Sequence, residues 1–216
     1  MKKVLIMAVT LLVTLSAQAQ FPAEVKEVLK KCDEKMASYG TDDGVVMDMD
    51  VRVKVSILSM NGTLKMYGKH KKYFSVLTMK MMSEEIKSEF GFDGNQKWEF
   101  RAATDKEEKD SLFITKTQSS VNKFGVKSDY ESEYKHAKMK EKGLYYEITF
   151  SGPKKKDVSK TATIKIAKSN YLLREYSTDI DKGKMFMTIT KITKGCSDNW
   201  FKLDMNRYKN AAVVRK

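Results

Sequence analysis

The chain has 216 residues, and its 41 Lys and Arg against 28 Asp and Glu give a net charge of +13. A balance this basic suits a nucleic acid, an anionic membrane surface or an acidic partner. The N-terminal segment predicts export, which excludes nucleic acid as the partner. Beyond that segment, no apolar run is long enough to cross a bilayer.

Residues 1–19 have the layout of a secretory signal peptide. Two lysines precede an apolar run from Val4 to Leu15, and the small-residue pattern Ala17-Gln18-Ala19 follows. The apolar run is too short to span a membrane. We expect cleavage after Ala19, which leaves residues 20–216 as a single exported domain that is long enough to bury its own core.

The next two segments predict a helix and a long strand. Residues 22–38 place apolar side chains at the three-four spacing of a helix with one buried stripe, at Val25, Val28, Leu29, Cys32 and Met36. Residues 45–57, VVMDMDVRVKVSI, are apolar at every odd position, which is typical of a strand with one apolar face and one wet face. Because twist accumulates along such a strand, we expect a strongly curved sheet.

Alternating strands and turns fill most of the remaining chain. Asn61-Gly62 and Asp93-Gly94 predict tight turns. Strands are expected at 63–67, 73–82, 86–92, 97–100, 134–140, 144–150, 161–168, 171–178 and 184–192, with Trp200–Leu203 as a candidate final strand and 206–216 as a tail. Residues 102–132 show no clear pattern. About ten strands joined by short turns predict a mainly β fold, built as a continuous antiparallel meander with one helix.

The sequence offers no catalytic constellation. Its two histidines, His70 and His136, lack a second histidine or cysteine at metal-ligand spacing. Motifs of serine hydrolases, dinucleotide binding and phosphate loops are absent. Asp179–Gly183 begins like a calcium loop but lacks the distal glutamate, so a hairpin turn explains it better. We therefore expect a protein without enzymatic activity, metal or cofactor.

The two cysteines leave two alternatives open. Cys32 shares the apolar face of the predicted helix, and Cys196 follows Gly195 in a predicted turn. Export permits a disulfide between them, which would join the first helix to the last hairpin. Simple packing of each thiol is the alternative.

Methionine is frequent, with 14 in the chain, and several lie on predicted apolar strand faces. Its flexible, polarisable side chain can line a surface that accepts ligands of variable shape, although the same residues could simply fill a core. A helix about 10 Å across covers roughly two strands, whereas ten strands would span about 48 Å. Such a sheet must curl round on itself, split into a sandwich or recruit residues 102–132 as further helices, and the first and third solutions enclose an apolar hollow. We hypothesise that this hollow binds hydrophobic chains.

Four features in order resemble the LolA-like family of periplasmic lipoprotein carriers. They are the export signal with its amphipathic helix; Gly62-Thr63-Leu64; the segment 92–100, FDGNQKWEF, which is similar to the family's aspartate-glycine hairpin with its tryptophan; and a C-terminal half with 147–154, 163–166, Phe201-Lys202-Leu203 and Val213-Val214. The resemblance covers nearly the whole mature chain.

This resemblance implies an incomplete antiparallel β-barrel with a helical lid, located in the periplasm and without enzymatic activity. It implies as partners acylated lipoproteins or other lipids, an inner-membrane exporter and an outer-membrane acceptor, with the carrier as a monomer. The family's arginine-proline pair, whose arginine fastens the lid, has no match, because Gly68-Lys69-His70-Lys71 stands there. Lysine is a poorer bidentate fastener than arginine.

We accordingly predict two functional regions. Residues Lys69, His70, Lys71 and Lys72 form a candidate docking or lid turn. The candidate hydrophobic ligand cavity is lined by Met47, Met49, Val51, Val53, Leu64, Met66, Phe90, Phe92, Trp98 and Phe100. The alternative function is a non-enzymatic regulatory or protein-interaction module of the envelope that uses the same fold.

Overall fold

The computed structural model describes residues 21–39, 42–81, 84–104, 108–116 and 130–215. The predicted signal peptide and its cleavage point lie outside these ranges. Of the segment 102–132, which showed no clear sequence pattern, the described parts form one strand and one short helix, while 105–107 and 117–129 lie outside.

Within these ranges the chain forms twelve strands and four helical elements. The helical elements are α2 (Ala23–Ala37), α3 (Tyr130–Glu133) and the 3₁₀ helices η2 (Asp198–Phe201) and η3 (Met205–Tyr208). The strands are β1 (Val45–Val55), β2 (Leu58–Lys69), β3 (Lys72–Met81), β4 (Glu84–Phe92), β5 (Gln96–Arg101), β6 (Ser111–Lys116), β7 (Tyr134–Lys142), β8 (Tyr145–Pro153), β9 (Thr161–Ala167), β10 (Leu173–Ile180), β11 (Gly183–Lys194) and β12 (Ala212–Arg215).

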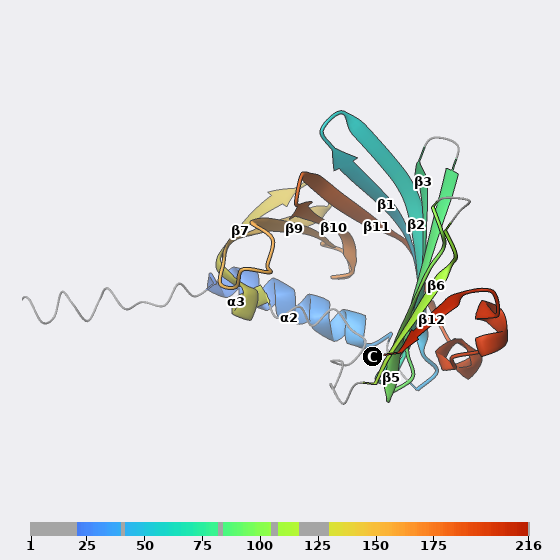
Figure 1. Ribbon diagram of the computed structural model, residues 1–216. Coiled ribbons are helices and arrows are strands. Elements are labelled where there is room, and N and C mark those ends of the chain that lie inside the picture. Colours follow the sequence, from blue (N-terminus) through green and yellow to red (C-terminus); the bar gives the residue numbers. More distant parts are fainter. Residues whose placement is uncertain (1–20, 40–41, 82–83, 105–107, 117–129, 216) are drawn as a thin grey trace, which may run out of the picture.

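All described strands belong to one open sheet in the order β12-β6-β5-β4-β3-β2-β1-β11-β10-β9-β8-β7. The sheet bends around α2 without closing, so the predicted incomplete barrel with an N-terminal helix is confirmed (Figure 1). The predicted continuous meander is wrong in two respects. β1 pairs with β11 as well as with β2, and β12 adds to β6 in the parallel direction.

One predicted turn is wrong. The chain reverses at Ser56 and Ile57, with Ser56 at φ 53°, and Asn61-Gly62 lies inside β2. A Cβ on Gly62 would stand 2.1 Å from the carbonyl oxygen of Thr78 on β3. Glycine is therefore needed there because the two backbones approach closely, which is the other common reason for glycine within a strand.

The predicted final strand at Trp200–Leu203 is also wrong, because its first half belongs to the 3₁₀ helix η2. The side chain of Ser197 caps this helix by accepting a hydrogen bond from the backbone N–H of Asn199. In the same way, Asp204 caps η3 through the N–H of Asn206. Short polar caps thus interrupt the apolar run and turn it into a compact segment. We call this segment, Cys196–Arg215, the tail, which is a longer range than the predicted tail 206–216.

Two hydrophobic cores lie on opposite faces of the sheet. On the inner face, which is the face toward α2, the helix core contains Val25, Val28, Cys32 and Met36 of α2 with Val45, Met47, Met49, Ile148, Phe150, Ile164, Ile166 and Ile189 of the sheet. On the outer face, the tail core contains Tyr67, Phe74, Trp98, Leu112, Ile114, Phe201 and Tyr208. Figure 1 shows α2 and the tail on opposite sides of the strands.

Candidate functional site

Strand register decides which predicted cavity residues share the inner face. Met47 and Met49 of β1 stand opposite Met66 and Leu64 of β2, and all four face α2. Met47 and Met49 are buried in the helix core, and Leu64 and Met66 are half-buried against it. These four residues therefore form the floor beneath the helix.

Beyond the helix core, the inner face continues as an apolar surface that is only half-buried. One row of paired residues crosses five neighbouring strands, at Met187, Val51, Gly62, Met79 and Ile86, and all but the glycine add an apolar side chain. We call the half-buried residues of this region the open apolar face: Val53, Met60, Leu77, Met79, Ile86, Phe90, Met185 and Met187. They belong to neither core.

Only Val53 and Phe90 of the open apolar face were among the predicted cavity residues. Two other predicted residues lie beyond the floor on the inner face but are buried. Val51 is buried, and Phe92 is 2% exposed with its ring 6.0 Å from that of Tyr73. The local alternation of 73–82 could not show which side of β3 faces inward. The β2–β3 register now places Leu77 opposite Leu64 and Met79 opposite Gly62, so both face inward.

Trp98 and Phe100 do not lie on this face, although the sequence grouped them with Phe90 and Phe92. Gly91 pairs with Trp98, and a Cβ on Gly91 would stand 2.1 Å from the indole ring. The indole therefore covers the glycine backbone on the outer face, within the tail core. The register correspondingly brings the neighbouring residues of β5 to the inner face.

Strand β5 consequently borders the open apolar face with charge. Lys97 stands opposite Phe92, Glu99 stands opposite Phe90, and Arg101 follows on the same side of the strand. The Arg101 Nε atom donates to the Glu99 carboxylate over 2.6 Å. An apolar surface with a polar rim of this kind is typical of ligand sites.

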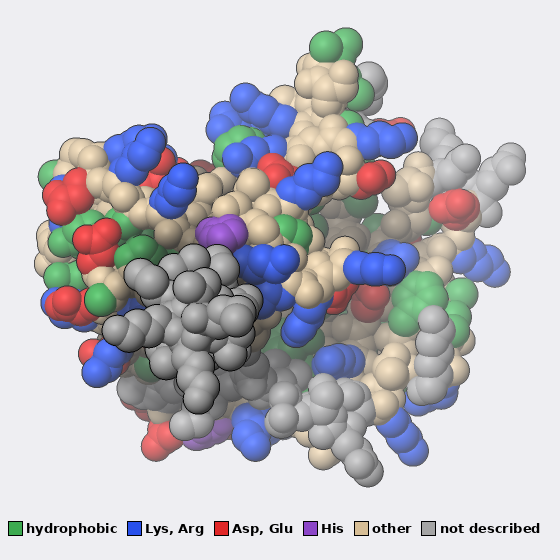
Figure 2. All heavy atoms as spheres, turned by 90° about the vertical axis from the view of Figure 1, so that its left-hand side faces the viewer, with side chains coloured by type: hydrophobic (Ala, Val, Ile, Leu, Met, Phe, Trp, Pro, Cys, Tyr) green, Lys and Arg blue, Asp and Glu red, His purple; other side chains and the backbone are tan. Residues whose placement is uncertain are grey.

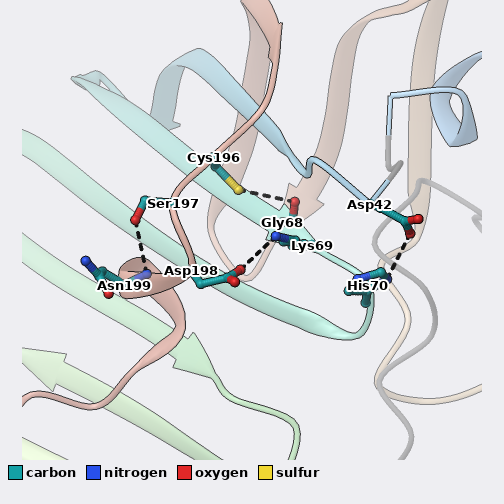
Figure 3. Close-up of polar contacts among 8 residues, drawn as sticks. All are labelled: Asp42, Gly68, Lys69, His70, Cys196, Ser197, Asp198 and Asn199. Atoms are coloured by element: carbon teal, nitrogen blue, oxygen red, sulfur yellow. Dashed lines mark hydrogen bonds and ion pairs between the residues drawn. The ribbon is translucent and has the colours of Figure 1, made fainter.

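The predicted docking turn lies between β2 and β3, against the tail (Figure 3). The Lys69 ammonium contacts the Asp198 carboxylate at 2.9 Å, and Nδ1 of His70 lies 3.7 Å from a carboxylate oxygen of Asp42. Lys71 and Lys72 are exposed. Lys69 thus fastens this turn to η2, and a docking or lid role for the turn stays a prediction.

The two cysteines are free thiols, so the alternative of a disulfide is wrong. Cys32 is packed in the helix core, while Cys196 packs against the tail core on the opposite face of the sheet. Burial raises the pKa of the Cys32 thiol to about 12. The sheet therefore separates the two sulfur atoms, which rules out a bond between them.

Within the described ranges, no group of three histidine, cysteine or acidic side chains is arranged to hold a metal ion. Both histidines are exposed, on the β2–β3 turn and on β7. Among the helices that the structure describes, none is long and apolar enough to span a membrane. The most distinctive surface of the described chain is thus the open apolar face.

The sequence matches no family model, and no curated protein is significantly similar to it. The fold is similar to that of an uncharacterized conserved protein from Thermus thermophilus, with a TM-score of 0.54, 10% identity, and coverage of 89% of this chain and 99% of that one.

Two further solved structures match the chain with lower TM-scores. LolA superfamily protein NE2245 from Nitrosomonas europaea has a TM-score of 0.38 at 10% identity, covering 83% of this chain and 98% of that one. Lipoprotein LppX from Mycobacterium tuberculosis has a TM-score of 0.44 at 13% identity, covering 80% and 98%.

Proposed function

We propose that this protein binds the acyl chains of lipoproteins or other lipids on its open apolar face and carries them through the periplasm toward the outer membrane. The observation that supports this is the half-exposed row Met187, Met79 and Ile86 with its neighbours, which α2 and the tail leave partly open to solvent. In this proposal the protein is a binder and not an enzyme, and its other partners are an inner-membrane exporter and an outer-membrane acceptor.

The physical task of such a carrier is to hide apolar surface without holding it permanently. Leaving one sixteen-carbon chain in water costs on the order of 10 kcal/mol at about 0.8 kcal/mol per methylene. Met60, Met79, Met185 and Met187 contribute flexible thioethers to the face, and these can adapt to chains of different shape. The predicted signal peptide, residues 1–19, supplies the route of export.

Titration of the purified mature protein, residues 20–216, with a fluorescent fatty acid tests the proposal. The double variant Met79→Gln/Met187→Gln makes the central row polar at similar volume. The matched control, Lys80→Gln/Thr188→Gln, changes the next residue of each strand, which faces outward and is exposed. We expect saturable binding that the first pair weakens at least tenfold, or about 1.4 kcal/mol, and that the control pair leaves unchanged.

Two outcomes would overturn the carrier proposal. One is the absence of saturable binding by the wild-type protein, and the other is equal affinity in both double variants. The alternative interaction module predicts the first outcome together with a stable complex with another envelope protein.

A further inference from the structure

The tip of the β1–β2 hairpin exposes large apolar side chains that neither core uses. Ile57 is 95% exposed and Leu58 is 60% exposed. Val55 pairs with both Leu58 and Gly183, so the neighbouring β10–β11 turn lies beside this tip and adds Ile180, which is 37% exposed. Figure 1 shows the β1–β2 hairpin projecting beyond the rest of the sheet.

Cations surround this tip, and none of them forms an ion pair with a carboxylate of the described residues. Lys54 stands directly opposite Lys184 on β11, an arrangement of like charges that destabilises a strand pair. Among the described residues, no carboxylate lies within ion-pair distance of Arg52, Lys54, Lys182 or Lys184. Figure 2 shows hydrophobic side chains at the summit of the projection, with lysine and arginine side chains below them.

An aromatic ring gathers three of these cations on the outer face. Nζ of Lys54 and Nζ of Lys184 lie 6.0 and 5.8 Å from the ring centroid of Phe186, and Cζ of Arg52 lies 4.9 Å from it. Asp181 lies in the β10–β11 turn. Asp179 on β10 stands opposite Lys184, but its carboxylate accepts hydrogen bonds from the backbone N–H and hydroxyl of Thr161 and is not within ion-pair distance of Lys184. The balance around the tip is therefore positive.

A second hairpin turn shows that exposed leucine alone does not create this arrangement. Leu144, in the β7–β8 turn, is 77% exposed. The nearby cations are neutralised there, because Lys142 pairs with Glu147 at 2.7 Å and Lys168 pairs with Glu141 at 2.6 Å. The combination of exposed apolar side chains and unpaired cations distinguishes the β1–β2 tip.

We propose that this tip docks the protein on an anionic lipid bilayer. Ile57 and Leu58 enter the interfacial layer, where burial of apolar side chains is favourable, and the surrounding cations contact lipid phosphates. Val53, Met60 and Met185 lie immediately below the tip on the inner face. The docked orientation therefore brings the open apolar face to the membrane surface, although docking itself does not depend on acyl binding.

Co-sedimentation of the full mature chain with lipid vesicles tests this docking. The vesicles are an equal mixture of phosphatidylglycerol and phosphatidylcholine, compared with pure phosphatidylcholine. We expect binding to the mixed vesicles only. That binding should weaken strongly in about 1 M salt, where the Debye length is about 3 Å instead of about 10 Å at 0.1 M.

Three variants locate the contact. Ile57→Ser/Leu58→Ser should weaken binding to the mixed vesicles at least tenfold, and Lys54→Gln/Lys184→Gln should weaken it about tenfold or more while reducing its salt dependence. Leu144→Ser is the matched control at the other turn, and it should bind as the wild type does. All the substituted side chains are largely exposed or at the surface. A thermal unfolding temperature equal to that of the wild type verifies that each variant is folded.

Docking is overturned if the wild type does not bind the mixed vesicles, binds pure phosphatidylcholine equally, or loses as much affinity through Leu144→Ser as through the tip variant. The fatty-acid titration is read separately. Loss of vesicle binding in the tip variant with unchanged fatty-acid binding supports docking, and docking also stands if the wild type binds vesicles through the tip but binds no fatty acid. A failure of the carrier proposal is thereby distinguished from a failure of docking.

Discussion

The two halves of the sheet are stabilised on opposite faces. In β7–β11, α2 covers the inner face, and the outer face carries ion pairs such as Lys165 with Glu175 at 2.7 Å. In β2–β6, the tail covers the outer face, and the inner face of β2–β4 remains half-open and apolar. The open apolar face thus exists because the tail packs on the side away from the helix.

The half of the sheet that α2 covers depends on the buried ring of Phe150. Phe150 is 0% exposed, and its ring lies 4.1 Å from that of Tyr130 and 5.6 Å from that of Phe21. We expect Phe150→Ala to lower the free energy of unfolding by about 3–5 kcal/mol, because the cavity left behind cannot collapse fully. Urea denaturation measures the loss.

The matching change on the open apolar face, to be compared with Phe150→Ala, is Leu77→Ala. Its half-exposed side chain already contacts solvent, so we expect a loss below about 2 kcal/mol. Comparable losses in Phe150→Ala and Leu77→Ala would show that the inner face of β3 is a packed core and would contradict the distinction.

A buried carboxylate on β4 attaches the tail to the sheet. Glu89 of β4 is 2% exposed and accepts hydrogen bonds from Arg207 and Tyr208 at 2.8 Å each, with Lys87 at 2.9 Å. We expect Glu89→Gln to cost about 1.5–3 kcal/mol, since hydrogen bonds to a charged group are lost. Urea denaturation of Glu99→Gln, at a more exposed pair on the next strand, provides the control and should show little change.

The same carboxylate predicts a pH dependence. Burial alone would raise the pKa of Glu89, but hydrogen bonds from Lys87, Tyr208 and Arg207 outweigh burial and hold the pKa below its usual 4.5. Because the folded pKa is depressed, this contribution to stability is complete above about pH 4.5 and is lost as the pH falls through 4.5 toward the folded pKa. The stability difference between wild type and Glu89→Gln should shrink in that window, and a constant difference would exclude this role.

The third and smallest effect uses the two cysteines as reporters, one for each core. Cys32 is 4% exposed, and its pKa is raised to about 12 by burial, whereas Cys196 is only half-buried. In the native protein, we expect a thiol reagent to label Cys196 well before Cys32, since thiolate and access are both required. Mass spectrometry of quenched samples follows each site.

Glu89→Gln sharpens this measurement. If Glu89 holds the tail, the variant should accelerate labelling of Cys196 by about tenfold or more, because each 1.4 kcal/mol of lost local stability is tenfold in the open population. Labelling of Cys32 should change less. Equal acceleration at both cysteines would mean that the two cores open together.

The period-two pattern correctly identified most strands, because alternation is a local property of the chain. Val45–Val55 has its odd residues on the inner face, and α2 buries the predicted stripe of Val25, Val28, Cys32 and Met36. The same pattern failed at Trp98 and Phe100. The Asp93 carboxylate accepts hydrogen bonds from the N–H groups of Asn95 and Gln96 at 2.8 and 2.9 Å, and the resulting turn pairs Gly91 with Trp98.

A shift of one residue in pairing exchanges the two faces of a strand, so alternation cannot assign a face without the register. This explains why the candidate site was only partly predicted. Met79 and Met187 were evident as apolar strand residues, but only the pairing of five strands placed them in one row. The register of β1 and β11 was likewise needed to show that the like charges of Lys54 and Lys184 stand opposite each other.

The elements of this protein can be read from its local sequence: an amphipathic helix, alternating strands and the absence of a recognisable catalytic motif. Those features follow from side-chain spacing within a few residues. Three features depend on how the chain packs in three dimensions: the tail covers the outer face, the inner face of β2–β4 stays half-open, and Ile57 projects beside cations that have no ion pair among the described residues. These outcomes depend on contacts between segments far apart in the chain, because register and coverage are settled when strands and tail pack together.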